Sequence, residues 1–386
     1  MRFPGFDEPY RKYQIGDVYA ERSQRGAGDM ELLSVTMNDG VMPRSEIEGK
    51  DNSSEDKSNY KIVCKGDMVY NSMRMWQGAN GVSNYNGIVS PAYTVLMPIE
   101  EIDNQYFVAL FKTSNLINEF RKNSQGLTSD TWNLKYPQIR AIKLYIPSLQ
   151  EQHKISSFFS TLEERIAKQR QLVDTLKKYK RGAVRHLLSP KSCPLKKARW
   201  TTAKMGELGS FVKGAPLSKA DISEDGTPFI LYGELYTTYN EVITSVKRRT
   251  QAQVDELFLS RVGDVVIPTS GETPEEISTA SCVMLPGVIL AGDLNIFRGD
   301  KVDGRIISYL LNHVVNAKIA RIAQGKSVVH IQASELRKLT LTYPDKNTQN
   351  TIIGLLSLLD DQIMNEENVL AFLSDLKEGL LQQLFI

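Results

Sequence analysis

Side chains that could read nucleic-acid bases gather in a few polar loops of this sequence. Arg, Asn, Gln, Ser and Thr can form hydrogen bonds with base edges or with phosphates. Two such loops directly follow short apolar, strand-like runs at 68–70 and 265–267. Loops of this composition also occur at ordinary exposed turns, so the pattern alone leaves both interpretations open. The candidate DNA contacts are Asn71, Ser72, Arg74, Trp76 and Gln77 in the first half, and Thr269, Ser270, Lys326, Ser327 and His330 in the second.

Motifs for catalysis give a largely negative result. Gly325, Lys326 and Ser327 resemble the end of a phosphate-binding loop, but Ala320 stands where that loop requires a glycine. The Asn-Pro-Pro-aromatic motif of amino-methyltransferases does not occur. Asp264 and Asp293 have no clustered Glu and Lys of the nuclease type, which favours roles as turn residues and caps. We therefore expect a chain without catalytic residues, and not an enzyme by itself.

Metal and cofactor chemistry is not indicated either. Cys64, Cys193 and Cys282 lie far apart and have no Cys or His neighbour at metal-ligand spacing. The N-terminus lacks an apolar signal region, and no run of about 18 apolar residues occurs in the sequence. The expectation is a soluble cytoplasmic protein with no metal and no cofactor of its own.

The elements that position the polar loops belong to an internal repeat. Residues 139–187 align without a gap on residues 336–384 at an offset of 197, with apolar residues on apolar ones. The same offset pairs two Gly-Asp dipeptides, each beside a strand-like run, and residues 15–18 match residues 205–208 at an offset of 190. The chain is therefore a tandem duplication. Identical pairs at the offset of 197 are Gly66 and Gly263, Asp67 and Asp264, Pro147 and Pro344, Gln152 and Gln349, and Gly182 and Gly379.

Each copy ends in a pattern that predicts a long helix. Ser148 and Glu151 form a capping box, and Asp345 occupies the N-cap position in the second copy. Apolar residues then follow at alternating steps of four and three, as in a coiled-coil seam. A surface helix on each domain remains the alternative. The predicted seam contains Ile155, Phe159, Leu162, Ile166 and Leu176 in the first helix, and Ile352, Leu356, Leu359, Ile363 and Leu373 in the second.

Length and charge favour pairing of these two helices. A helix of roughly 40 residues is about 60 Å long, so an antiparallel pair would hold two globular units at opposite ends. Residues 148–199 contain thirteen Lys or Arg against four Asp or Glu, whereas residues 345–386 contain two against seven. Opposite net charges favour association of the two helices with each other. The basic run 177–185 could also face DNA phosphates, although such runs are more often a solvated face.

The fold class that follows is α+β, with two globular domains and a pair of long antiparallel coiled-coil helices related by a pseudo-two-fold repeat. Each globular segment mixes short strand-like runs with one helical segment, at about 105–121 and 304–323. The predicted divisions are a domain at 1–147, a long helix at 148–188, a linker at 189–199, a domain at 200–344 and a second long helix at 345–386.

The whole chain resembles the specificity subunit of type I restriction-modification enzymes. The resemblance rests on the opening residues 2–6, on residues 15–17, on the Gly-Asp repeat and on the helix entry that contains Pro147, Gln152 and Ile155. It implies two target-recognition domains, each reading one half of a bipartite site in double-stranded DNA. It also implies a helix pair that sets the spacer and docks two methyltransferase subunits, which bind S-adenosylmethionine. Restriction subunits would join them, and adenine methylation and ATP-dependent cleavage would belong to those partners.

Two other classes of protein stay open at this point. A fused nuclease or methyltransferase would need a catalytic motif, and would modify or cut DNA without partners. A scaffold of two binding modules joined by a coiled coil would not bind DNA at all. Phosphate contacts release counterions, so a steep salt dependence of DNA affinity separates the DNA-binding hypothesis from the scaffold.

Overall fold

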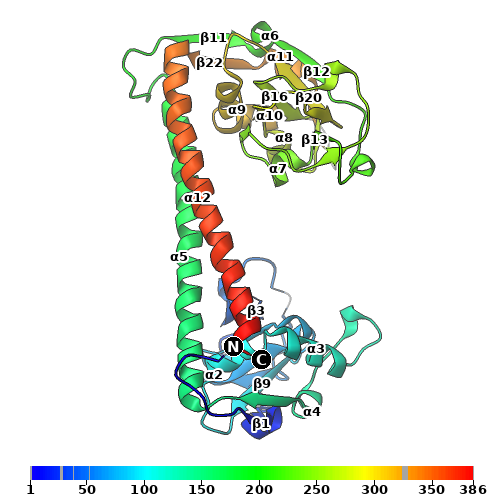
Figure 1. Ribbon diagram of the computed structural model, residues 1–386, viewed down its shortest axis with the longest axis vertical. Coiled ribbons are helices and arrows are strands. Elements are labelled where there is room, and N and C mark those ends of the chain that lie inside the picture. Colours follow the sequence, from blue (N-terminus) through cyan, green and yellow to red (C-terminus); the bar gives the residue numbers. More distant parts are fainter. Residues whose placement is uncertain (1, 27–28, 38, 52, 324–328, 386) are drawn as a thin grey trace. The chain divides into compact units, whose positions relative to one another are not determined.

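The protein is described by a computed structural model, which covers residues 2–26, 29–37, 39–51, 53–323 and 329–385. The chain forms two compact units. Unit 1 contains residues 1–171 and 367–386, and unit 2 contains residues 172–366. Each unit is a mixed helix and sheet domain with parts of the two longest helices (Figure 1).

Unit 1 has an antiparallel four-stranded sheet in the order β2-β9-β6-β7. Three two-stranded ladders, β1-β10, β3-β4 and β5-β8, accompany it. The strands are β1 Arg11–Gln14, β2 Tyr19–Glu21, β3 Leu33–Thr36, β4 Gly40–Pro43, β5 Lys61–Val63, β6 Met68–Asn71, β7 Asn80–Val82, β8 Gly87–Val89, β9 Tyr93–Pro98 and β10 Lys143–Ile146. The helices are α1 Ile15–Val18, α2 Asn104–Leu110, α3 Ser114–Asn123 and α4 Tyr136–Ile139, with 3-10 turns η1 Arg44–Glu46, η2 Met75–Gln77 and η3 Ser129–Thr131.

Unit 2 has a five-stranded sheet in the order β12-β20-β16-β18-β14, in which only β14 and β18 pair in parallel. A three-stranded sheet, β15-β13-β19, and the ladders β11-β22 and β17-β21 complete it. The strands are β11 Trp200–Lys204, β12 Ser210–Lys213, β13 Thr227–Leu231, β14 Val242–Ile243, β15 Arg249–Thr250, β16 Asp264–Pro268, β17 Ser270–Gly271, β18 Ser281–Val283, β19 Ile289–Ala291, β20 Leu294–Arg298, β21 Val329–His330 and β22 Thr340–Pro344. The helices are α6 Met205–Leu208, α7 Glu234–Thr237, α8 Pro274–Ile277, α9 Gly304–His313, α10 Asn316–Ile322 and α11 Ala333–Lys338, with 3-10 turns η4 Lys219–Asp221 and η5 Glu256–Phe258.

The single helical segment expected in each domain is in fact two helices. The break in unit 1 falls between α2 and α3, where the Thr113 hydroxyl donates a hydrogen bond to the Leu110 carbonyl. The break in unit 2 falls at Val314 and Val315, two adjacent β-branched residues between α9 and α10. A hydroxyl that bonds a nearby carbonyl competes with the helical ladder, and β-branched residues have lower helix propensity.

Two helices of 39 residues each, α5 Leu149–Leu187 and α12 Lys346–Leu384, begin within one residue of the predicted starts. In unit 1 the Glu163 carboxylate of α5 pairs with the Lys377 ammonium of α12, and the Phe159 ring contacts the Phe385 ring just beyond α12. Since the residue number rises along α5 while that of its partner falls along α12, the two segments run antiparallel in this unit. In unit 2 Lys180 of α5 pairs with Asp360 of α12.

The predicted seam residues are mostly buried, but the two ends of the seam pack on the domains. Ile155 and Phe159 belong to the hydrophobic core of unit 1, and Ile352 and Leu356 to that of unit 2. Leu162, Ile363 and Leu373 are buried, whereas Ile166, Leu176 and Leu359 are half-buried. Burying such a side chain stabilises the fold by about 1.5–3 kcal/mol. Each long helix is therefore attached to its own domain through part of the seam.

A repeated glutamine connects each long helix to its domain. The Gln152 amide donates to the Pro147 carbonyl at 3.0 Å and accepts from the Asp103 backbone N–H at 3.1 Å. Gln349 makes the same two contacts, with Pro344 at 2.8 Å and Asp303 at 2.9 Å. Asp103 and Asp303 are the N-caps of α2 and α9. The recurrence of this glutamine at an offset of 197 is thus explained by a buried contact that both units require.

Candidate nucleic-acid interface

Two polar loops lie together in each unit, and an equivalent backbone hydrogen bond joins them. In unit 1 the Leu134 N–H donates to the Ser72 carbonyl at 2.8 Å. In unit 2 the Ile331 N–H donates to the Thr269 carbonyl at 2.9 Å. Both donors and both acceptors differ by the repeat offset of 197. The loop that follows β6 therefore meets the segment 125–134, and the loop that follows β16 meets β21 and the residue directly after it.

Aromatic contacts support the paired loops in unit 1. The Trp76 ring packs edge-to-face on the Trp132 ring at 5.2 Å, and its indole N–H donates to the Met73 carbonyl at 3.0 Å. The Arg121 guanidinium lies over Trp76 at 5.6 Å. Arg74 is exposed, while Trp76 and Gln77 are partly exposed. These side chains form a surface with two cationic groups and a partly accessible aromatic ring.

Two of the predicted contact residues in unit 1 are turned toward the protein. The Ser72 hydroxyl is buried and lies 2.8 Å from the Thr94 hydroxyl. The Asn71 carboxamide oxygen accepts from the Met73 N–H at 3.0 Å, which closes a local turn. Strand β6 is buried on both faces, so the first residue after it continues into the interior. In this structure Ser72 is thus not accessible as a surface contact.

The loops of unit 2 share the backbone hydrogen bond of the unit 1 loops but carry different side chains. Ser270 pairs with His330 in the ladder of β17 and β21. The Ser270 hydroxyl is buried and donates to the Asp293 carboxylate at 2.8 Å, whereas His330 is exposed. Thr269 is partly exposed. The predicted contacts Lys326 and Ser327 lie outside the described residues.

A groove of about 880 Å³ in unit 2 borders these loops. Thr269 and His330 line it together with Asp293. Exposed Lys213 and Arg337 line it as well, and sequence reasoning did not single out either cation. Arg337 could have been found, because the offset of 197 pairs it with the exposed Arg140 of unit 1. The offset of 197 pairs Lys213 with Gly16, so the repeat does not indicate this lysine.

The repeated Gly-Asp dipeptides form the turn before the strand that leads into each polar loop. Gly66 and Gly263 both have φ of 94°, a backbone conformation that favours glycine. Asp67 and Asp264 are buried, and each accepts a hydrogen bond from the backbone N–H three residues earlier. Arg22 pairs with Asp67 at 2.6 Å, and Arg298 pairs with Asp264 at 3.1 Å.

The carboxylate of Asp264 has an electrostatic environment that fits this structural role. Burial raises its pKa, while hydrogen bonds from the Arg261 N–H and from Arg298 oppose that rise. Asp293 is the acceptor for Ser270 in the neighbouring loop. The two carboxylates therefore serve a turn and a loop contact. No group of three or more His, Cys, Asp or Glu residues suited to a metal ion occurs in the described part of the chain.

Comparison with known proteins identifies the family. The family described as type I restriction modification DNA specificity domain matches residues 8–178 and again residues 197–372. A protein of Methanocaldococcus jannaschii, provisionally named the type I restriction enzyme MjaX specificity subunit, is 22% identical over 346 residues, or 81% of this chain and 76% of that protein. The type I restriction enzyme HindI specificity subunit of Haemophilus influenzae is 25% identical over 176 residues, or 43% of this chain and 38% of that protein.

Solved structures show the same fold over nearly the whole chain. A chain from a study of complex assembly and conformational transition of the type I R-M system superimposes with a TM-score of 0.61, 14% identity and coverage of 97% of both chains. The type I restriction-modification S subunit of M. genitalium gives a TM-score of 0.59, 14% identity, and coverage of 100% of this chain and 99% of that chain. Within the described residues, no helix is both long enough and apolar enough to span a membrane. The two matches along the sequence, which together span most of the chain, establish that it belongs to the type I restriction-modification DNA specificity family and contains two copies of the family's domain.

Proposed function

We propose that each unit reads one half of a bipartite site in double-stranded DNA, and that α5 and α12 pair to set the spacing between the halves. The observation that carries this proposal is the equivalent backbone hydrogen bond that joins two polar loops in both units. The same scaffold thus presents different side chains, Arg74 and Trp76 in one unit and Thr269 and His330 in the other. Two domains with the same backbone arrangement and different loop side chains suit a DNA site whose two halves differ in sequence.

Within this proposal, the reading residues among the described ones are those that are exposed or partly exposed. Arg74, Trp76 and Gln77 serve the first half-site, and Thr269 and His330 serve the second. Lys326 and Ser327 are assigned to the second half-site from the sequence alone. The buried hydroxyls of Ser72 and Ser270, together with the Asn71 turn, hold the loops in place. The divisions 1–147, 148–188, 189–199, 200–344 and 345–386 then correspond to reader, helix, linker, reader and helix.

The proposed partners on the long helices are two methyltransferase subunits. Exposed apolar side chains recur on α5 and α12 at an offset of 197, which is unusual for surfaces that face only water. A surface that occurs twice suits two copies of one partner. Unit 1 exposes Phe158, Val369 and Leu376, and the equivalent residues Leu355, Leu172 and Tyr179 are exposed in unit 2.

Catalysis belongs, in this proposal, to the partners. The methyltransferase subunits bring S-adenosylmethionine and methylate adenine, and restriction subunits supply ATP-dependent cleavage. The chain itself supplies target choice and geometry, in the cytoplasm. Purified chain without partners is expected neither to methylate nor to cut DNA, and either activity would revive the enzyme hypothesis.

The decisive experiment is methylome sequencing of cells that express this chain with a cognate methyltransferase subunit. The matched variant replaces residues 1–147 with the corresponding segment of another specificity subunit. The expected result is a bipartite adenine-methylated motif in which the exchange alters one half only. If no motif appears although the complex assembles, the chain is a scaffold of another kind and the proposal fails.

The contact residues are tested in the assembled complex by alanine at Arg74, Trp76, Lys326 and His330. Each lost phosphate contact should reduce the slope of log affinity against log salt by about one, and each lost base contact should cost about 1–3 kcal/mol of discrimination. Unchanged DNA binding by the fourfold variant would refute these assignments. Charged residues at both Leu162 and Leu359 should separate the helix pair and abolish methyltransferase docking, and an intact complex would refute the spacer role.

A further inference from the structure

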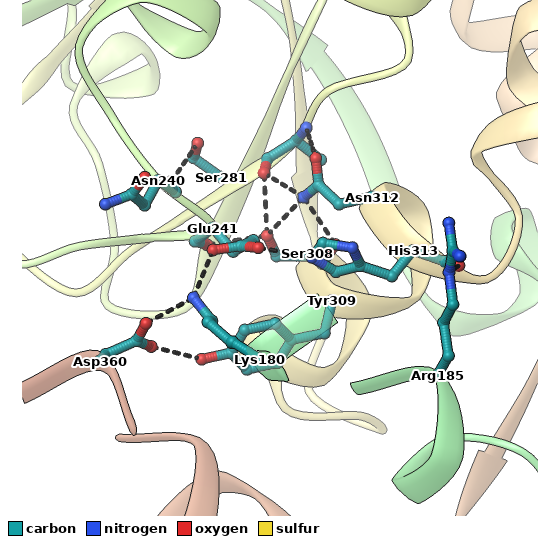
Figure 2. A network of polar contacts seen from close by, with 11 residues as sticks. Lys180, Arg185, Asn240, Glu241, Ser281, Ser308, Tyr309, Asn312, His313 and Asp360 are labelled. Carbon is teal, nitrogen blue, oxygen red and sulfur yellow. Dashed lines mark hydrogen bonds and ion pairs between the residues drawn. The ribbon is translucent and has the colours of Figure 1, made fainter. Parts of the chain in front are cut away.

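A buried lysine of α5 lies between two carboxylates in unit 2 (Figure 2). Lys180 is only 6% exposed. Its ammonium group lies 2.6 Å from the Glu241 carboxylate, which comes from the loop before β14, and pairs with the Asp360 carboxylate of α12. One ammonium therefore connects the recognition domain of this unit with both long helices.

Further polar groups of α9 complete this network. The His313 imidazole Nε2 contacts the second oxygen of Glu241. The Tyr309 hydroxyl donates to Asp360 at 3.0 Å, and the Lys180 ammonium lies 5.5 Å from the Tyr309 ring centre. Figure 2 shows the Glu241 and Asp360 carboxylates on either side of the Lys180 ammonium, with Tyr309 beside it. We call Lys180, Glu241, Tyr309, His313 and Asp360 the lysine network.

Side chains of α9 hold the domain backbone next to the lysine network through hydrogen bonds to backbone carbonyls. The Ser308 hydroxyl lies 2.7 Å from the Glu241 carbonyl and 2.9 Å from the Ala280 carbonyl. The Asn312 amide also donates to Ala280, at 2.6 Å. Arg185 of α5 donates to the His313 carbonyl at 3.2 Å, which adds a second contact between the helix and α9. Glu241 therefore has little freedom to follow a displaced Lys180.

The interaction of Lys180 with Glu241 depends on the orientation of the domain relative to the helices, because both groups are charged. Burial would raise the pKa of Glu241, but the His313 contact and the Lys180 ammonium together lower it to about 2. A buried charge is costly unless its partners stay in place, so a shift of the domain on the helices is penalised even when apolar contacts tolerate it. A purely apolar contact lacks this dependence on orientation.

The equivalent position in unit 1 is different. The offset of 197 relates Lys180 to Lys377 and Asp360 to Glu163, and the ion pair between the two helices is kept. The Lys377 and Glu163 side chains are, however, 26% and 53% exposed. The nearby side chain from the domain is Lys112, whose pKa is lowered by burial and by the proximity of Lys377. In unit 1 the domain therefore places a cation, and not a carboxylate, near the ion pair of the two helices.

We propose that Lys180, Glu241 and Asp360 are positioning residues that fix the orientation of the second recognition domain on the helix pair and so restrict the spacer length that the complex accepts. The inference rests on the proposed reading of a bipartite site. None of the three residues lies in the reading loops, so their substitution should change the accepted spacing and leave the bases of each half-site unchanged.

The test measures methylation by the complex on DNA duplexes whose two half-sites are separated by the native spacer or by one base pair more or less. Lys180→Met removes the charge at similar volume, and Lys377→Met is the matched control at the repeat-related position. A misplacement of about 1 Å can change rates by about a hundredfold. The preference for the native spacer is expected to fall at least about tenfold in K180M and to remain within about twofold in K377M.

Lys180→Met also leaves two partly buried carboxylates without their cation, which by itself can destabilise unit 2. The triple variant Lys180→Met, Glu241→Gln, Asp360→Asn removes the network without orphan charges, and thermal unfolding verifies that it is folded. A folded triple variant that keeps the full spacer preference overturns the inference. An equal loss in K377M also overturns it. Absence of a bipartite motif in the wild-type complex would instead refute the proposed function itself.

Discussion

Both units attach a recognition domain to the long helices through an apolar core, but the contacts that supplement this core differ between them. In unit 1 the Phe385 ring lies 5.2 Å from Tyr106 of α2 and 5.8 Å from Phe159 of α5, and Leu381 and Leu384 belong to the same core. In unit 2 the attachment includes the buried charges of the lysine network. Aromatic contacts hold over a range of angles, whereas hydrogen-bonded charges demand one geometry. A duplicated backbone therefore does not imply two equally constrained readers.

Within unit 1, the largest loss of stability is expected from breaking the aromatic attachment. Phe159→Ala removes a buried ring from the core of unit 1 and should lower the free energy of unfolding by about 3–5 kcal/mol. Phe158→Ala, at the neighbouring exposed ring, is the matched control and should cost about 1 kcal/mol or less while weakening methyltransferase docking. Chemical denaturation of the two variants measures this difference. Equal losses of stability would contradict the distinction between the core and the docking surface.

Lowering the pH should destabilise the attachment in unit 2 more than the attachment in unit 1. The folded pKa of Glu241, about 2, lies below its ordinary value of 4.5, so its charge contributes stability above pH 4.5 that is lost as the pH falls toward 2. Burial raises the pKa of Asp360, which acts in the opposite direction and relieves part of the loss. In unit 1 the Phe159 and Phe385 rings carry no ionisable group, and the charged contacts of α5 with the domain there include Asp103 with His153 and Glu151 with Arg2.

Hydrogen exchange in α9 and α2, corrected for intrinsic rates, tests this prediction between pH 6 and pH 3. Protection of α9 in unit 2 should decrease more than protection of α2 in unit 1. The lysine network should also respond to Glu241→Gln, which should reduce the pH dependence in α9 and leave α2 unchanged. A larger loss in α2 would show that the ionic attachment is not the acid-sensitive one.

A contact that both units share should behave the same in both. Gln152→Ala and Gln349→Ala each leave a backbone N–H and a proline carbonyl without a partner at a buried position, which should cost about 1–3 kcal/mol. The exposed Lys168→Ala on α5 provides a control of about 0.5 kcal/mol or less. Urea unfolding should give matching losses for the two glutamines. If the two variants lost clearly different amounts of stability, the two units would differ in more than the lysine network.

The smallest effect is expected at the ion pair of unit 1, which is more exposed than the lysine network. Lys377→Met should change stability by about 0–1 kcal/mol, because exposed pairs lose little when one partner is removed. Lys180→Met, at the repeat-related buried site, should cost about 3–5 kcal/mol. Calorimetry on the two single variants compares them directly. Similar costs would remove the contrast between the two lysines.

Sequence reasoning predicted the parts of the structure that are local or repeated. The helix starts expected at 148 and 345 lie within one residue of the starts of α5 and α12, and Asp345 accepts from the Thr348 N–H as an N-cap does. The capping box expected at Ser148 is not what occupies Glu151, whose carboxylate accepts from Arg2 and from the Phe3 N–H. The offset of 197 marked Gln152 and Gln349, and Gly66 and Gly263, before any contact was known, because both copies need the same buried bond or the same turn. Local signals sufficed there, since capping and left-handed turns depend on few neighbouring residues.

Other features depend on residues far apart in sequence. Glu241 lies 61 residues from Lys180 and has no equivalent in the repeat, so neither periodicity nor spacing indicates their contact. The contact between Trp76 and Trp132 is likewise tertiary. Ser72 was expected at the surface because serine is common in loops, but a strand buried on both faces leads into it. Burial on two faces cannot be read from a run as short as 68–70.

The backbone hydrogen bond between the paired loops has a consequence for how new specificities arise. Leu134 with Ser72, and Ile331 with Thr269, are joined through main-chain atoms alone. A main-chain bond is available to every residue except proline at the donor position. Loop side chains can therefore be exchanged by mutation or recombination without loss of the bond that shapes the loop, and each half of the chain is free to acquire a new target while the other keeps its own.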